Sequence, residues 1–286
     1  MKRKEKNITD QEVLKSLPHN RKELFFDLLK NRKMTLFAIS CFTFMFFIPL
    51  AVDLFFFNFL ESAAIAEGLD NQLFSLFFYS MLIMLPCMLI GFLGFAGAFY
   101  IIKKLVWQED VSIAVDFFNG IKENWKHSII NGAIFGIILF GCVMGTSYLI
   151  IFAPMAPVWC GIGIGALILV LLFFGMVISL YFTLCVYYQN TVAETFKNAF
   201  AFLGLTNWKT FLVYLFSTGA VIALCCFNMI TLAIGLFLFA ILNSVVIVLY
   251  TLIAHSAFDK YINKEHHPDY VNKGLYKVDT NDTKEA

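Results

Sequence analysis

Charged residues are scarce in this sequence. Only 14% of its 286 residues are Asp, Glu, Lys or Arg, whereas an ordinary soluble domain carries about 25% charged residues. Sixty per cent of the residues are hydrophobic, and 34 residues are Phe. A soluble fold of this length cannot hide so much apolar surface from water. The composition therefore excludes a soluble protein and predicts a chain that crosses a membrane several times.

Motifs for catalysis and for metal binding are also missing. The sequence has no G-x-x-x-x-G-K loop, no nucleophile elbow and no H-E-x-x-H motif. His266 and His267 are adjacent, unlike the i, i+4 pair of a helical zinc site. Gly161, Gly163 and Gly165 lack the spacing of a dinucleotide-binding loop. The seven cysteines form no C-x-x-C pair and fall in or beside apolar runs, as small core residues do. We expect no enzymatic activity, no cofactor, no metal site and no nucleic-acid partner.

Six apolar runs make up most of the chain. A transmembrane helix needs about 20 residues, and each run approaches or exceeds that length. The predicted spans are 34–60, 73–102, 128–153, 158–188, 210–227 and 231–254. We expect residues 1–33 to form a cytosolic tail with a surface helix, 34–254 a single membrane domain, and 255–286 a cytosolic tail. The predicted fold class is all-α, a polytopic membrane protein with six transmembrane helices in three hairpins.

Glycines recur within the second, third and fourth spans at intervals of three to five residues. Small residues at such spacing let neighbouring helices approach closely. They are Gly91, Gly94 and Gly97, then Gly132, Gly136, Gly141 and Gly145, then Gly161 and Gly165. Pro86 is a further candidate for a bend in the second span. Between the third and fourth spans, Pro154 and Pro157 frame a joint so short that the two spans must form a hairpin.

A polar and aromatic stretch precedes the third span. Residues 111–125 place apolar side chains on one face at helical spacing, which predicts an amphipathic helix on the inner membrane surface. The side chains that we expect to face lipid are Val115, Phe118 and Trp125. Asp116 and Glu123 lie on the opposite face, which we expect to face water.

Similar stretches precede the first and the fifth spans. Each ends in a lysine with an Asn two positions earlier: Asn31 and Lys33, then Asn124, Trp125 and Lys126, then Asn207, Trp208 and Lys209. We therefore expect three units, each a cytosolic amphipathic surface helix followed by a hairpin. Convergence is the alternative, because any membrane interface favours Trp and Lys. We interpret the Trp and Lys residues as interface anchors and the Asn residues as caps where a surface helix turns into a span.

The basic residues all fall on one side of this topology. Ten Lys or Arg precede the first span, four lie between the second and third, two between the fourth and fifth, and five follow the sixth. Together they are all 21 basic residues of the chain. Cytoplasmic loops carry an excess of Lys and Arg, so both termini are predicted to be cytoplasmic.

Four polar residues inside the spans or their joints are candidates for a polar path through the membrane: Asp53, Asn131, Asn228 and Asn243. Asp53 is the only carboxylate inside an apolar run, and an ionisable group at such a place is a functional candidate by default. Hydrogen bonding between helices explains the same residues equally well. Both interpretations stay open.

Four short runs stand out between the second and third spans: Tyr100 to Leu105 (YIIKKL), Trp107 to Ser112 (WQEDVS), Asp116 to Phe118 (DFF) and Lys122 to Lys126 (KENWK). Together they resemble the YesL-like family of bacterial membrane proteins. The match covers chiefly the second span through the third, and this chain is longer, with a third hairpin and a tail. The resemblance implies a bacterial plasma membrane and a place beside an ABC-type sugar uptake system. It supplies no catalytic residues.

These observations lead to two hypotheses about function. The first is a non-catalytic accessory or assembly partner of a sugar uptake system, as the resemblance implies. The alternative is a small-solute or ion transporter or channel in its own right, with Asp53 and the intramembrane Asn residues along its path. In either case the lipid bilayer is a partner.

Overall fold

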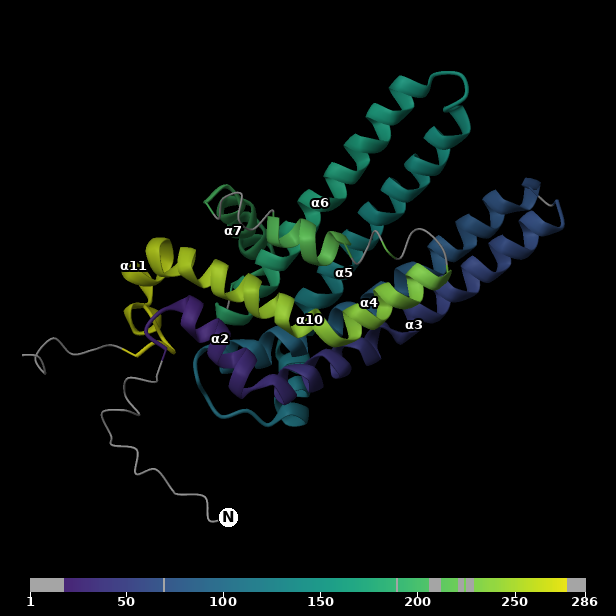
Figure 1. Ribbon diagram of the computed structural model, residues 1–286. Coiled ribbons are helices and arrows are strands. Elements are labelled where there is room, and N and C mark those ends of the chain that lie inside the picture. The colour runs from purple at the N-terminus through teal and green to yellow at the C-terminus, as the bar shows by residue number, and fades with distance from the viewer. Residues whose placement is uncertain are drawn as a thin grey trace, which may run out of the picture.

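The computed structural model describes residues 18–68, 70–188, 190–205, 212–220, 224 and 229–276. Every regular element within these ranges is a helix, and Figure 1 shows the long ones forming an elongated bundle. The shorter elements are α2 (Arg21–Asn31), α7 (Val192–Leu205), η1 (Leu215–Gly219), η2 (Asp259–Asn263), α11 (Lys264–His266) and η3 (Pro268–Tyr270).

Five of the described helices are long and apolar enough to cross a membrane. They are α3 (Lys33–Ala66), α4 (Asp70–Val106), α5 (Ile113–Phe152), α6 (Pro157–Tyr187) and α10 (Met229–Phe258). Two predicted boundaries lie within one residue of the structure: α5 ends at 152 and was predicted to end at 153, and α6 ends at 187 and was predicted to end at 188. An all-helical fold with five helices long and apolar enough to cross a membrane is thus confirmed, as expected of a helical membrane protein.

Part of the fifth predicted span, 210–227, lies outside the described residues, which cover 212–220 and 224 of it. Within its described part, the buried ring of Tyr214 lies 6.2 Å from that of Tyr250 on α10. The rings of Tyr187 and His255, near the ends of α6 and α10, lie 4.9 Å apart. The C-terminal ends of α6 and α10 therefore lie side by side, so the two helices run in the same direction. The chain between them must return to the other end of the bundle, which favours one more membrane span between α6 and α10. Six spans stay a prediction.

The predicted surface helix at 111–125 is not a separate element. Ser112 is the N-cap of α5, and the helix then continues without a break to Phe152. The physical reason is packing: Phe117 is fully buried, and its ring lies 5.5 and 5.7 Å from those of Phe42 and Phe46 on α3. The first turns of α5 bury this side chain against α3 and α4 instead of lying flat on lipid.

The turn between α3 and α4 is shorter than the sequence indicated. We predicted a loop from 61 to 72, but α3 continues to Ala66 and α4 begins at Asp70. Glu61 therefore lies within a helix. With 34 and 37 residues, these helices measure about 50 and 55 Å at about 1.5 Å per residue, well beyond a hydrocarbon core of about 30 Å. The hairpin must tilt or project from the bilayer.

The glycines of α4 stand where helices approach closely, as predicted. A Cβ atom at Gly94 would lie 2.8 Å from Cβ of Phe46, and one at Gly97 would lie 2.8 Å from the ring of Phe117. Gly132 of α5 is similarly close to Phe92 of α4, at 3.2 Å. The prediction was wrong for the glycines that face open space, with nothing within 4 Å of a Cβ: Gly141, Gly161 and Gly165.

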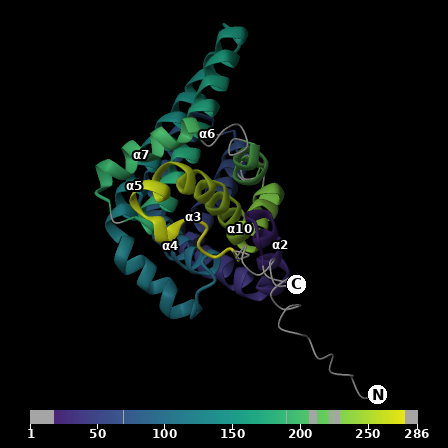
Figure 2. The same ribbon diagram turned by 90° about the vertical axis from the view of Figure 1, so that its left-hand side faces the viewer.

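The core is aromatic and lies toward one end of the bundle. Phe182 of α6 stacks on Phe99 of α4 with ring centroids 5.4 Å apart. From this core the α3–α4 hairpin and the α5–α6 hairpin diverge, so that their turns lie far apart, while α10 runs beside α3 (Figure 1). Figure 2 looks onto the opposite end, where α2 and the end of α10 meet.

Candidate functional site

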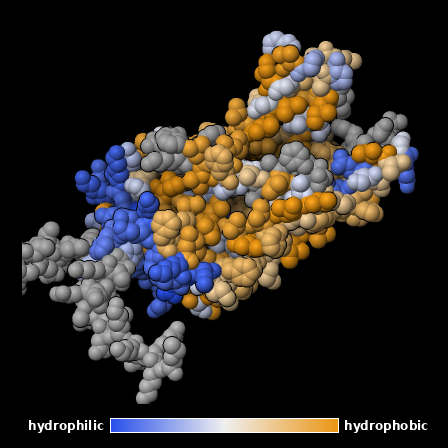
Figure 3. Space-filling model, in the orientation of Figure 1, coloured by the Kyte–Doolittle hydropathy of each residue, from blue (hydrophilic) through white to orange (hydrophobic). Residues whose placement is uncertain are grey.

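The basic residues of the described chain gather at the end of the bundle away from the hairpin turns. Every described Lys and Arg lies in or beside α2, at the end of α4, in the first four turns of α5, on α7 or beyond the end of α10. Figure 3 shows the hydrophilic surface at this end, and we call it the polar end. The segregation matches the placement of Lys and Arg on which the topology prediction rests.

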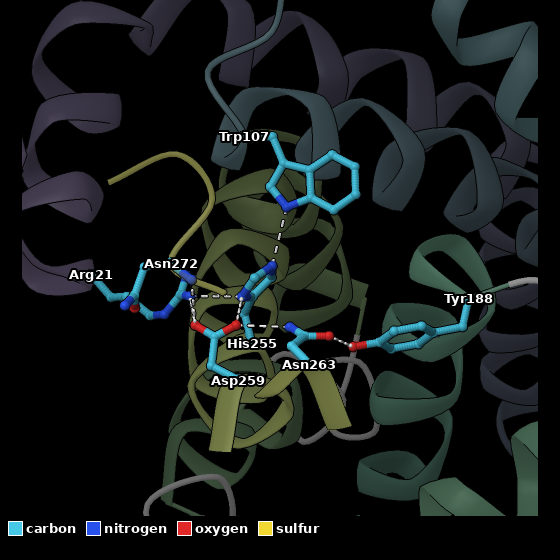
Figure 4. A network of polar contacts seen from close by, with 7 residues as sticks. All are labelled: Arg21, Trp107, Tyr188, His255, Asp259, Asn263 and Asn272. Atoms are coloured by element: carbon cyan, nitrogen blue, oxygen red, sulfur yellow. Dashed lines mark hydrogen bonds and ion pairs between the residues drawn. The ribbon is translucent and has the colours of Figure 1, made fainter. Parts of the chain in front are cut away.

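A network of polar contacts lies at the polar end, centred on Asp259 (Figure 4). The Asp259 carboxylate forms an ion pair with Arg21 of α2 and lies 3.4 Å from Nδ1 of His255, one turn earlier. On the other side of the His255 ring, Nε1–H of Trp107 donates a hydrogen bond to Nε2 at 3.1 Å. The network thus joins α2, the end of α4 and the end of α10.

These contacts determine the protonation of His255. The indole of Trp107 is only a donor, so Nε2 of His255 must accept, and the neutral ring then carries its proton on Nδ1. Nδ1 faces Nη2 of Arg21 at 2.7 Å, a group that is also only a donor, and the Asp259 carboxylate at 3.4 Å. A proton on Nδ1 therefore points toward Asp259 beside a competing Arg21 donor, and a second ring proton would point at the Trp107 donor. With donors facing both ring nitrogens, the arrangement favours a neutral His255.

Further polar groups extend the network to α6 and to the C-terminal segment. Nδ2 of Asn263 donates to Oδ1 of Asp259 at 2.7 Å, and the Tyr188 hydroxyl donates to Oδ1 of Asn263 at 2.6 Å. The backbone N–H of Asn272 donates to Oδ2 of Asp259 at 3.3 Å. One carboxylate thus connects segments from five parts of the chain, which is the arrangement of a structural junction.

The sequence analysis did not single out these residues. His255 and Asp259 stand at i, i+4 directly after the last apolar run, and Trp107 stands directly after α4. That spacing is the one signal in the sequence, because residues i and i+4 share a helix face. Which distant groups meet that face depends on how α2, α4, α6 and α10 end together.

Asp53 is buried between α3 and α4. Only 8% of this residue is exposed. Its Oδ2 accepts a hydrogen bond from the Ser80 hydroxyl at 3.2 Å. This bond joins α3 and α4, as the interpretation of interhelical hydrogen bonding expects. A buried carboxylate with a neutral partner keeps the transporter hypothesis open.

The other predicted path residues do not meet Asp53 in the described contacts. Asn131 of α5 is fully buried, and neither its amide nitrogen nor its oxygen has a hydrogen-bond partner among the described residues. Asn243 of α10 is also buried, and its amide nitrogen has no hydrogen-bond partner among the described residues. Asn228 lies outside the described residues. Each described group sits on a different helix, α3, α5 or α10.

The predicted interface residues of α5 divide into two groups. Val115, Phe118 and Trp125 are all exposed, at 60%, 57% and 48%, as expected of side chains that face lipid. Asp116 was expected to face water but is buried; it forms an ion pair with Lys104 at 2.8 Å. The continuous helix brings its first turn against the end of α4, and this contact buries the carboxylate.

The predicted cap role of Asn124 is wrong. Asn124 lies in the middle of α5, where there is no turn to cap, and its Nδ2 donates to the carbonyl of Gly120 at 3.0 Å. Lys126 is exposed and lies 5.7 Å from the ring centroid of Trp125. The equivalent residues of the third unit, Asn207, Trp208 and Lys209, lie outside the described residues.

Comparison with known proteins gives no relative. No family model, no curated protein and no solved structure matches the chain. The YesL-like resemblance therefore stays a prediction. Within the ranges that the structure describes, no three His, Cys, Asp or Glu side chains come together as metal ligands would.

Proposed function

We propose that the protein is a non-catalytic accessory or assembly partner of an uptake system in the bacterial plasma membrane. It would span the membrane six times, in three hairpins, with both termini in the cytoplasm. The observation that carries this proposal is the polar end, where one carboxylate ties together segments from α2, α4, α6, α10 and the C-terminal segment. A junction of this kind makes a stiff surface, and a stiff surface is suited to hold a partner protein.

The polar groups inside the membrane support the same proposal. Those with described partners mostly close onto their own helix or onto one neighbour: Thr43 bonds to the carbonyl of Ile39, for example, and Ser80 to Asp53. The bond within one helix only satisfies the hydroxyl group, whereas a bond between helices such as Ser80 to Asp53 stabilises helix packing by about 0.6 kcal/mol. A partner role needs packing of this kind, whereas a solute path needs polar groups in sequence along one route. The association with sugar uptake rests on the YesL-like resemblance.

Affinity capture in mild detergent tests this proposal. Capture of the tagged full-length protein should bring down a transporter complex in stoichiometric amount. A double variant that alters the exposed surface of the polar end, such as Lys260→Glu with Lys264→Glu, should lose the complex, while Ile137→Ala on the lipid-facing side of α5 should keep it. Recovery of the protein alone under every mild condition would contradict the proposal.

A transporter or channel is the second candidate, because Asp53 is buried with Ser80 as its described partner. If Asp53 binds a cation or solute, Asp53→Asn should abolish flux in reconstituted vesicles while leaving the folded yield unchanged. Ser80→Ala serves as the matched control, since it removes the hydrogen bond and keeps the charge. Absence of any flux through the parent protein across a panel of ions and sugars would count against this candidate.

A further inference from the structure

The C-terminal residues 268–276, which we call the strap, lie across the end of α4. The backbone N–H of Tyr276 donates to the carbonyl of Pro18 at 2.9 Å, so the two described ends of the chain meet here. Lys273 lies in the middle of the strap, and its Nζ donates to Oε1 of Glu109 at 2.9 Å. The strap is therefore held by contacts to segments distant in sequence.

The side chain of Lys273 sits on an aromatic face. Its Nζ lies 3.6 Å from the ring centroid of Trp107, within the range of a cation–π contact. Trp107 is held in place by its hydrogen bond to His255 and by Tyr187, whose ring lies 5.2 Å away. We call Trp107 and Glu109 together the lysine seat, because one supplies an aromatic face and the other a carboxylate.

Gly274 lets the strap backbone lie directly on α4. Its φ is +85°, and a Cβ atom there would lie 2.0 Å from the carbonyl oxygen of Val106. A positive φ disfavours other residues, and so does the contact with a backbone atom. Turns shape the backbone here, since the N–H of Lys273 donates to the carbonyl of Tyr270 and that of Leu275 to the carbonyl of Asn272. The seat therefore takes a turn-forming segment in which a lysine is followed by glycine.

The contacts of the seat are those of a reversible interaction. The side chains of Lys273 and Glu109 are 34% and 38% exposed, and ion pairs and cation–π contacts at that exposure are individually weak. The tether adds to these contacts, because it gives the strap an effective concentration on the order of millimolar. A segment of another protein with the same chemistry would bind only when the strap leaves.

We propose that the lysine seat is a binding site for a turn-forming, lysine-bearing segment of a partner protein, and that the strap occupies it as an intramolecular competitor. The existence of a natural partner rests on the proposed function. The exchange of segments at the seat does not, and it is measurable on the protein alone. Release of the strap would uncover Trp107 and Glu109 at the polar end.

Trypsin measures release of the strap, because it cleaves after Lys273 only when that lysine leaves the seat. In full-length protein in mild detergent, Glu109→Gln and Gly274→Ala should each raise cleavage after Lys273 about tenfold or more, as followed by mass spectrometry. Cleavage after the exposed Lys264 is the internal reference, and Gly161→Ala, a glycine with open space around it, is the matched control. Equal cleavage after Lys273 in parent and variants would overturn the proposal.

A fluorescein-labelled peptide of residues 268–276 then tests binding in trans. It should bind the full-length Gly274→Ala variant and not the parent, and a peptide with Lys273→Ala should bind neither. Equal binding of the peptide to the parent and to the variant would show that it binds an adventitious surface. Absence of binding to a variant whose strap is released would show that the seat accepts no second segment. Either result would overturn the proposal. Failure to capture a transporter complex would refute the proposed function and leave the peptide result intact.

Discussion

Single residues show where the stability of this fold is concentrated. Asp259 is the clearest case, because its carboxylate faces Arg21 while both side chains are largely buried, at 12% and 14% exposure. Removing one partner of a buried ion pair leaves an uncompensated charge. Asp259→Ala should therefore lower the free energy of unfolding by about 3 kcal/mol, measured by denaturation in mild detergent. Asp269→Ala, at an exposed carboxylate, should change the free energy of unfolding little. Equal effects of the two substitutions would contradict a stabilising role of the network around Asp259.

Asn131 leads to the opposite expectation. Its amide is fully buried without a described partner, and a buried polar group left unpaired costs about 1–3 kcal/mol. Asn131→Leu, which keeps the branched shape and the number of side-chain heavy atoms and removes the polar atoms, should raise stability by about 1 kcal/mol. Asn131→Ala should gain less, because it leaves a cavity. A loss of stability in Asn131→Leu would mean that the amide has a partner.

At the residue scale, sequence reasoning found the exposed groups better than the buried ones. Val115, Phe118 and Trp125 were predicted correctly, because a helical apolar face is a local pattern. Asp116 was not, since its burial depends on the approach of Lys104 from the end of α4. The junction around Asp259 escaped prediction for the same reason: its members come from five segments.

Elements were predicted where the pattern was long. Apolar runs of the length of α3, α4, α6 and α10 allow few alternatives in a membrane, because backbone groups must be satisfied within the segment. The division of α5 into a surface helix and a span was wrong, since a change from polar to apolar composition does not interrupt a helix. The first turns of α5 belong to the bundle because Phe117 packs against α3.

Helix α7 offers a test at this scale. Its N-cap Thr191 and Glu194 form a capping box: the Thr191 N–H donates to the Glu194 carboxylate at 3.0 Å, and the Glu194 N–H faces the Thr191 hydroxyl at 3.4 Å. Thr191→Ala should destabilise α7 by about 1 kcal/mol, seen as about fivefold faster amide hydrogen exchange along the helix. Thr191→Ser should keep the parent rate. Unchanged exchange in Thr191→Ala would show that tertiary contacts alone hold α7.

The capping box also makes α7 sensitive to acid. Hydrogen bonds from the backbone and side chain of Thr191 lower the pKa of Glu194 below its ordinary value. A lowered pKa means that this carboxylate stabilises the helix above its ordinary pKa and ceases to do so as the pH falls through the lowered one. Hydrogen exchange of α7, corrected for its intrinsic pH dependence, should therefore rise below about pH 4 in the parent and not in Glu194→Gln.

The whole molecule allows a direct test of topology. All 21 basic residues fall on one side of the predicted spans, and excess Lys and Arg mark the cytoplasmic side. A reporter active only in the periplasm should therefore be silent when fused after Ala286. The same reporter inserted at Gly68, in the turn between α3 and α4, should be active. Activity after Ala286 together with silence at Gly68 would show that the protein has the opposite orientation in the membrane.

The divergence of the two hairpins has a consequence for the surrounding lipid. Because the α3–α4 and α5–α6 turns spread apart while the polar end stays compact, the molecule occupies more area in the leaflet that holds the turns than in the other. A wedge of this shape lowers the bending free energy where the wider leaflet is convex. Membrane tubes pulled from giant vesicles would concentrate the labelled protein in one orientation and deplete it in the other, making its distribution in the cell a matter of membrane shape as well as of partners.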